Sequence, residues 1–219
     1  MKIKNTKVYG LEESIIRSGY PMDVDEPNNI DHATSEWDIQ RTKKLASCKT
    51  GTGHDNFLKG IIVQFDLKYP QYFTSQLQRY SFIDIISSQS KMHKLTSIKD
   101  ITDNCNKYVL SNIITITNEL IELYNTNEYP CYIDDYGYIE SVSTDEPFKH
   151  KINTQNEMFQ YIISNLPMGY ELWMGISTNY LQLKTIYQQR KNHRLDEWKI
   201  FCNWIKGLPL ANELITMEK

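Results

Sequence analysis

The sequence predicts a mixed α/β (α+β) fold in which a mostly antiparallel sheet is covered by long helices. Three observations support this prediction. Residues 60–67 read GIIVQFDL, a β-branched segment bounded by Gly60 and Pro70, which is typical of an interior strand. Residues 106–124 repeat apolar side chains at helical spacing. Residues 128–146 place Asp135-Tyr136-Gly137 between tyrosine-rich segments, the pattern of a β-hairpin.

Weaker patterns predict the remaining elements. Apolar residues at every second position indicate strands, and apolar residues three or four positions apart indicate helices. An acidic segment rich in turn-forming residues, 21–37, predicts an exposed loop that leads into a helix near Thr34-Ser35. The other predicted elements are a strand at 2–8 and helices at 11–17, after Pro70, at 155–163 and at 195–205.

Composition limits the classes of protein to consider. The 219 residues, 40% of them hydrophobic, suit one domain, with residues 126–150 as a hairpin insertion. The net charge of -3 disfavours binding of duplex nucleic acid. No apolar run approaches the length of a membrane span, and residues 1–20 lack the apolar core of a signal peptide. The four cysteines are far apart, so we expect reduced thiols in a cytoplasm and neither a metal site nor a disulfide framework.

Residues 69–93 form the first candidate site, which we interpret as the floor of a polar pocket. Gln76 and Arg79 lie among apolar residues there, and buried polar groups without partners cost free energy. Pro70 suits the first turn of a helix whose far end would carry Gln76 and Arg79 one turn apart on one side. The glycine-rich segment 49–53 lacks the lysine and hydroxyl that a P-loop places after its second glycine, so a triphosphate site is the less favoured interpretation there.

Residues 179–193 form the second candidate site. Asn179 and Arg190 share one helical face and lie about 16 Å apart at 1.5 Å per residue, the scale of an elongated ligand such as a dinucleotide cofactor, or of two neighbouring ligands. Alternatively, Asn179 caps the helix and Arg190 pairs with Glu197 or the helix C-terminus. His193, taken alone, is typical of a core or surface histidine. Taken alone, Ser87, Ser88 and Ser90 favour an ordinary hydroxyl-rich helix start.

Both candidate sites carry a family resemblance. GHDNFLKGIIVQFDLKYPQYFTSQLQRY followed by SSQS resembles the core of the flavin-dependent thymidylate synthases, with its GH-x-S-like turn, strand, helix, Arg-His-Arg signature and Ser-x-Arg. The family also places Leu-Pro twelve residues before an asparagine, as Leu166-Pro167 precedes Asn179 here. NYLQLKTIYQQRKNHRLDEWKI then resembles the family helix that carries Asn, Arg and His ahead of a tryptophan. The two blocks cover roughly two fifths of the chain.

The departures from the family pattern mostly affect residues that bind one of the ligands. The Arg-His-Arg signature reads Arg79-Tyr80-Ser81, Met92 replaces the arginine of Ser-x-Arg, and Ile163 replaces a further arginine. In the family the lost arginines largely hold the nucleotide monophosphate, through a planar fork that lysine cannot copy. The resemblance therefore implies that the residues near the flavin match the family pattern better than the residues near the nucleotide phosphate.

The resemblance implies a divergent flavin-dependent methyltransferase that carries out reductive one-carbon transfer to a deoxyuridine or related pyrimidine nucleotide. Its implied cofactor is FAD, with NADPH and methylenetetrahydrofolate as co-substrates, and its implied assembly is a homotetramer. A phage or an AT-rich bacterium is the source that fits the residue usage. The alternative is a non-catalytic protein that binds a nucleotide or a partner on the same fold. The implied flavin-binding residues are Arg79, Tyr80, Asn179, Arg190 and His193. The implied nucleotide-binding residues are Gln76, Arg79, Ser88, Ser90, Lys91 and Arg190, with His93 as a further phosphate contact.

Overall fold

A computed structural model describes residues 1–23, 34–137, 139–140 and 150–217. The contacts divide the chain into two compact units. Unit 1 comprises Met1–Lys68, Phe73–Ser88 and Trp173–Lys219, and unit 2 comprises Tyr69–Tyr72 and Gln89–Leu172. The expectation that these units form a single domain stays a prediction. Within the described residues, no helix is both long enough and apolar enough to cross a membrane.

Unit 1 is built on a four-stranded sheet, whose strands in spatial order are β1 (Lys2–Tyr9), β2 (Ile62–Pro70), β7 (Glu171–Asn179) and β3 (Asp84–Ser88). β1 pairs antiparallel with β2, and β3 pairs antiparallel with β7. The N–H of Tyr180, just after β7, donates to the carbonyl of Ile61, just before β2, so the central pair is antiparallel too. The predicted sheet is confirmed.

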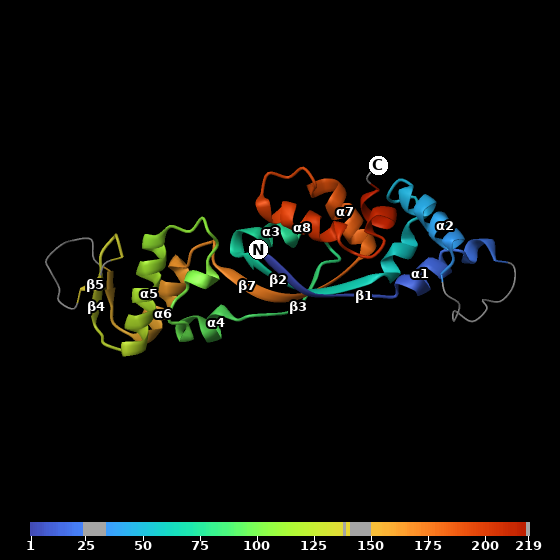
Figure 1. The fold of residues 1–219 in the computed structure, drawn as a ribbon. Coiled ribbons are helices and arrows are strands. Elements are labelled where there is room, and N and C mark those ends of the chain that lie inside the picture. Colours follow the sequence, from blue (N-terminus) through green and yellow to red (C-terminus); the bar gives the residue numbers. More distant parts are fainter. Residues whose placement is uncertain (24–33, 138, 141–149, 218–219) are drawn as a thin grey trace. The chain divides into compact units, whose positions relative to one another are not determined.

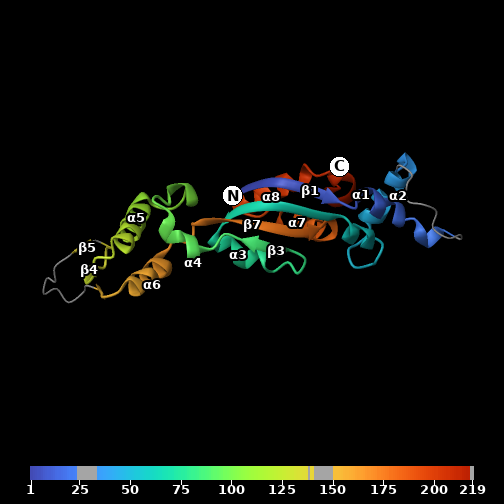
Figure 2. The same ribbon diagram turned by 90° about the horizontal axis from the view of Figure 1, so that it is seen from below.

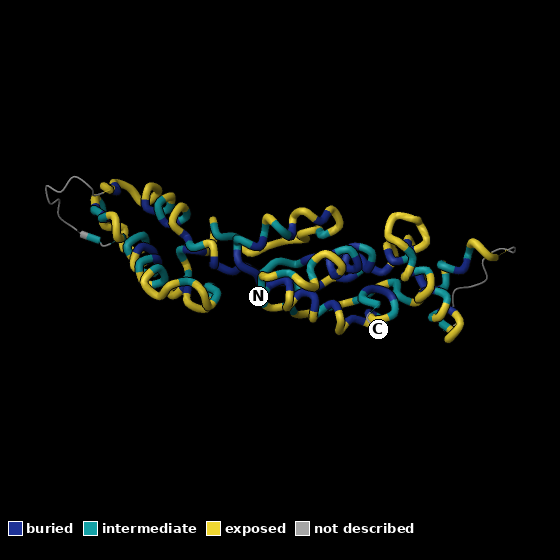
Figure 3. Tube along the Cα trace, turned by 90° about the horizontal axis from the view of Figure 1, so that it is seen from above, coloured by how far each residue is buried: buried dark blue, intermediate teal, exposed yellow. Residues whose placement is uncertain are grey.

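The core of unit 1 lies between this sheet and the helices α7 (Tyr180–Arg190) and α8 (Asp196–Lys206), which cover one face of it (Figures 1 and 2). β2 is interior, as predicted, and its alternate residues Val63, Phe65 and Leu67 are buried. The Phe65 ring lies 4.4 Å from that of Trp204 on α8. Such aromatic pairs add about 0.5–1.5 kcal/mol to the gain from burial. Buried residues accordingly concentrate along the central strands and the helices over them (Figure 3).

The other helices of unit 1 begin where the sequence predicts. α1 (Leu11–Arg17) matches its predicted range. α2 (Glu36–Ser47) starts after Ser35, whose hydroxyl accepts from the Asp38 N–H while the Asp38 carboxylate accepts from the Ser35 N–H. This capping box satisfies two N–H groups that would otherwise lack partners at the helix start. Residues 24–33 of the predicted loop lie outside the described residues.

Unit 2 contains a small three-stranded antiparallel sheet and two longer helices. The sheet has the order β5 (Ile139–Glu140), β4 (Cys131–Ile133) and β6 (His150–Ile152). The helices are α5 (Ser111–Thr126) and α6 (Gln155–Asn165), with the short α4 (Lys91–Lys94) before them. The pairing of β4 with β5 confirms a hairpin around Gly137, which has a φ of 88°. Residue 138 and residues 141–149 of the proposed insertion lie outside the described residues. The short 3-10 helices are η1 (Tyr20–Met22), η2 (Asn56–Gly60), η3 (Leu95–Ser97) and η4 (Thr102–Asn104), and η5 (Asn212–Thr216) is a π-helical turn.

The prediction for the helix after Pro70 needs a correction. α3 (Gln71–Leu77) ends before Arg79, so Gln76 and Arg79 do not share one helical face. The chain turns because the N–H of Tyr80 donates to the carbonyl oxygen of Leu77, three residues back. The ring of Tyr80 is buried by this turn, while Arg79 stays exposed. The free energy gained by burying the Tyr80 side chain therefore exceeds the free energy that one further turn of helix would contribute.

Candidate functional site

The two candidate segments meet inside unit 1. The Arg190 Nε at the end of α7 donates a 2.6 Å hydrogen bond to the hydroxyl of Tyr80. That hydroxyl in turn donates to Oε1 of Gln189 at 3.1 Å. Residues 110 positions apart in the sequence are thereby joined through one phenol. We call Tyr80, Arg190, His193, Trp198 and Gln76 the arginine cluster.

Trp198 of α8 is the buried centre of the arginine cluster. Its indole N–H donates to Oε1 of Gln76 at 2.7 Å. The Arg190 guanidinium lies 4.8 Å from the centre of the Trp198 ring and 5.6 Å from that of Tyr80. Cations at such distances are attracted to the negative face of an aromatic ring. Gln76 and Arg190 therefore contact the same ring; a shared ligand pocket stays a prediction.

His193 lies at the edge of the cluster, with its ring 6.4 Å from that of Trp198. Its Nδ1 accepts a hydrogen bond from the N–H of Leu195 at 3.2 Å, so Nδ1 carries no proton in this arrangement. Burial lowers the pKa of His193, and the neighbouring charges of Arg190 and Arg194 lower it further. The imidazole is therefore neutral near pH 7, with Nε2 as its N–H donor.

Asn179 has the structural role that the sequence left open as an alternative. Its side-chain oxygen accepts from the N–H of Gln182 at 2.9 Å and caps α7. Gln182 then accepts from the N–H of Phe82 at 3.3 Å, and the Thr178 hydroxyl donates to the Phe82 carbonyl oxygen at 2.7 Å. Residues 178–182 therefore hold the segment that follows Tyr80 in place.

The predicted nucleotide-binding residues are divided between the two units. Arg79 and Ser88 are exposed in unit 1, and Ser88 ends β3. Ser90 and Lys91 belong to unit 2, where the Ser90 hydroxyl accepts from the N–H of His93 and caps α4. Lys91 donates to the side-chain oxygen of Gln71 at 2.5 Å. A shared nucleotide site for these residues stays a prediction.

Unit 1 contains a buried ion pair that the sequence did not predict. Nζ of Lys184 lies 2.7 Å from the carboxylate of Asp55 and donates to the carbonyl oxygens of Ala46 and Cys48 at 2.6 and 3.4 Å. The pair ties α7 to the turn that resembles the GH-x-S turn of the family. A lysine between Leu183 and Ile186, both buried, was the available signal, but nothing in the sequence pointed to a partner 129 positions away.

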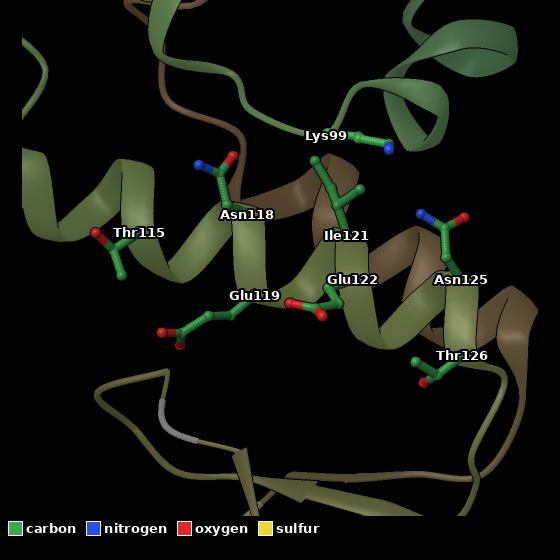
Figure 4. A pocket seen from close by; sticks show the side chains of 8 residues that line it. All are labelled: Lys99, Thr115, Asn118, Glu119, Ile121, Glu122, Asn125 and Thr126. Carbon is green, nitrogen blue, oxygen red and sulfur yellow. The ribbon is translucent and has the colours of Figure 1, made fainter.

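Unit 2 carries a polar pocket of about 630 Å³ beside α5, lined by Lys99, Thr115, Asn118, Glu119, Ile121, Glu122, Asn125 and Thr126 (Figure 4). None of the predicted site residues lines it. Within the described part of the chain, no group of three or more His, Cys, Asp or Glu side chains is arranged to hold a metal ion.

Comparison with known proteins identifies the fold. No protein-family model matches the chain, and no curated protein sequence matches it. Two crystal structures of flavin-dependent thymidylate synthase from Helicobacter pylori, both with FAD and dUMP, are similar at 12% identity. Their TM-scores are 0.65 and 0.64, and the matches cover 98% of this chain and 98% and 97% of theirs. At this identity the likeness concerns architecture, and the chain therefore has the fold of the flavin-dependent thymidylate synthases.

Proposed function

We propose that this chain is a divergent flavin-dependent thymidylate synthase-like protein that uses FAD for reductive one-carbon transfer to a deoxyuridine or related pyrimidine nucleotide. The observation that carries the proposal is the bond between Tyr80 and Arg190. These residues come from the two segments that resemble the family. The matching fold, found in an enzyme that binds FAD and dUMP, supports the same proposal.

The accessible groups of the arginine cluster fit a flavin. Arg190 and His193 are half-buried, so part of each side chain reaches the surface. The bond to Tyr80 uses Nε of Arg190, and its terminal amino groups are suited to the carbonyl oxygens of a flavin ring. Nε2 of His193 offers another N–H. Trp198 is fully buried and does not fit as a stacking surface for the flavin.

In this proposal the protein supplies position and charge, while bound FAD supplies the redox chemistry. Arg190 and His193 orient the flavin, and Tyr80 fixes the orientation of Arg190. Asn179 acts through the start of α7, because its side-chain oxygen is committed to the helix cap. NADPH as reductant and methylenetetrahydrofolate as carbon donor complete the proposed reaction.

The nucleotide is the less constrained part of the proposal. We assign its phosphate to Lys91 and His93 of unit 2 in place of the family arginines, with Ser90 as a further contact. An ammonium group binds phosphate as a point charge and an imidazole binds it through one N–H group, and neither has the bidentate geometry of arginine. A weaker or altered nucleotide preference is therefore expected.

A homotetramer is the proposed assembly. Phe82, Ile85 and Ile86 lie on or beside the edge strand β3 and are 56%, 42% and 60% exposed. Exposed apolar side chains on an edge strand favour association with another chain. The number of four chains comes from the family resemblance. Light scattering from the purified protein should give a mass of four chains, and a monomer would contradict this part of the proposal.

The absorbance spectrum of the purified protein tests the function. A flavin spectrum, retained through gel filtration, together with growth of a thymidine-requiring host that expresses the protein, is the expected result. A colourless protein that takes up no added FAD and does not support growth would refute it.

The non-catalytic alternative has one observation in its favour. The Tyr80 hydroxyl and the Asn179 side-chain oxygen are both occupied by internal hydrogen bonds. A scaffold that uses these groups for its own stability has less need of a cofactor. Saturable binding of dUMP to protein that takes up no FAD would favour this alternative.

A further inference from the structure

Unit 1 carries a pocket beside α7 and α8 that has a basic lining. It has a volume of about 460 Å³ and shares no residue with the arginine cluster. Three of its lining residues are lysines, Lys191, Lys199 and Lys206, and two are asparagines, Asn192 and Asn203. Among the lining residues described there is no carboxylate. We call this site the lysine pocket.

Two of the lysines converge on one aromatic ring. Nζ of Lys191, just after α7, lies 5.9 Å from the centre of the Tyr187 ring, and Nζ of Lys206, at the end of α8, lies 5.8 Å from it. Tyr187 is fully buried, so the position of the ring that both lysines approach is fixed by the core. An anion in the pocket would be attracted by the ammonium groups that line it.

The other groups of the pocket suit an anion as well. Lys199 holds Asp196 at 3.0 Å, and both side chains are about half exposed, so this ion pair is easily exchanged for a ligand. The side-chain amides of Asn192 and Asn203 are N–H donors. Burial raises the pKa of Cys202 to about 11, although Lys206 and Arg190 oppose the shift, so the thiol adds no negative charge.

We propose that the lysine pocket binds the phosphate chain of a small-molecule ligand. Because three lysines line the pocket, a ligand with more than one negative charge fits it best. A lysine ammonium group is a point charge and lacks the planar, bidentate geometry of an arginine guanidinium. The site should therefore accept phosphate chains of differing geometry. The volume suits a diphosphate group with part of what it is attached to. The flavin and nucleotide of the proposed reaction are assigned to other residues, so this site is independent of that reaction.

Calorimetric titration of the full chain with inorganic pyrophosphate tests the proposal. We expect saturable binding that weakens as salt is raised, because the contacts are charge pairs. The variant Lys191→Gln/Lys206→Gln should weaken binding at least tenfold. Lys44→Gln, which removes an exposed lysine on α2 in the same unit, should change it by less than twofold.

A second measurement covers the fold of the variant and the source of the phosphate. Pyrophosphate should raise the melting temperature of the natural protein and of Lys44→Gln, but not that of the double variant, whose unliganded melting temperature should be unchanged. ADP should bind within tenfold of pyrophosphate if the phosphate chain is the recognised group. Absence of saturable pyrophosphate binding, or equal weakening by Lys44→Gln, would overturn the proposal. Binding of ADP with none of pyrophosphate would also overturn it.

Discussion

Replacement of Lys184 by methionine should leave the buried charge of Asp55 without its partner. The Lys184 and Asp55 side chains are 1% and 2% exposed, and their charged groups lie 2.7 Å apart. Methionine has a length close to that of the lysine stem but no donor. The change therefore leaves the Asp55 carboxylate and the carbonyl oxygen of Ala46 without the ammonium that satisfies them now.

The expected loss follows from this burial. Removal of one partner of a buried ion pair destabilises a protein by about 3–5 kcal/mol, because the other charge stays uncompensated. The exposed pair of Lys199 and Asp196 is an internal control, since its side chains are 55% and 48% exposed. Exposed pairs are worth about 0–1 kcal/mol. Total stabilities are only about 5–15 kcal/mol, so Lys184→Met should remove a large part of the whole.

Urea unfolding followed by tryptophan fluorescence measures both effects. Lys184→Met should shift the midpoint far more than Lys199→Met. Addition of Asp55→Asn to Lys184→Met should restore about 1 kcal/mol or more of the free energy of unfolding, because it removes the unpaired buried charge. Equal shifts for the two lysine variants would refute the reasoning, since they would mean that the Asp55 carboxylate is hydrated.

Three further predictions concern the rest of unit 1. The pKa of His193 should be below 6.5 in a proton NMR titration, mainly because of burial, and Arg190→Ala should raise it. Since the unfolded chain then binds the proton more tightly, the contribution of His193 to stability is present above pH ~6.5 and is lost as pH falls through the window below it. Arg190→Ala should weaken FAD binding in a fluorescence titration at least tenfold, and Lys44→Ala should not; equal effects would contradict the proposed flavin site. Gly10→Ala and Gly51→Ala both force a side chain into positive φ, at 70° and 92°, which costs about 1–2 kcal/mol. Only the Cβ at position 10 would meet a backbone oxygen, at 2.6 Å, so thermal unfolding should show the greater loss for Gly10→Ala.

The sequence was informative where local chemistry decides the structure. The apolar segment that became β2, the Ser35 cap of α2 and the helical spacing of α1 and α8 were all readable, because each depends on residues within one or two turns. The end of α3 was not readable, because it depends on burial of Tyr80 against Trp198, more than a hundred positions away. Long-range packing leaves no local pattern.

The same distinction applies to the candidate site. Tyr80, Arg190 and His193 were named from family motifs, and the structure brings them together in unit 1. Gln182 and Gln189, which hold this arrangement, were missed because a glutamine on a helix has no distinctive spacing. Resemblance points to the residues that contact a ligand more readily than to those that position them.

Asn179 and Arg190 hold the two ends of α7 in place. Asn179 fixes the start of α7 through the Gln182 N–H, and Arg190 fixes its end through Tyr80. A ligand bound by the remaining donors of Arg190 would therefore contact a helix that is anchored at both ends, with Lys184 buried between them. Because an anchored helix has little conformational freedom to lose when the ligand binds, anchoring favours binding. A loss of ligand affinity on Lys184→Met, in protein that is still folded, would then measure how far this anchoring contributes to the site.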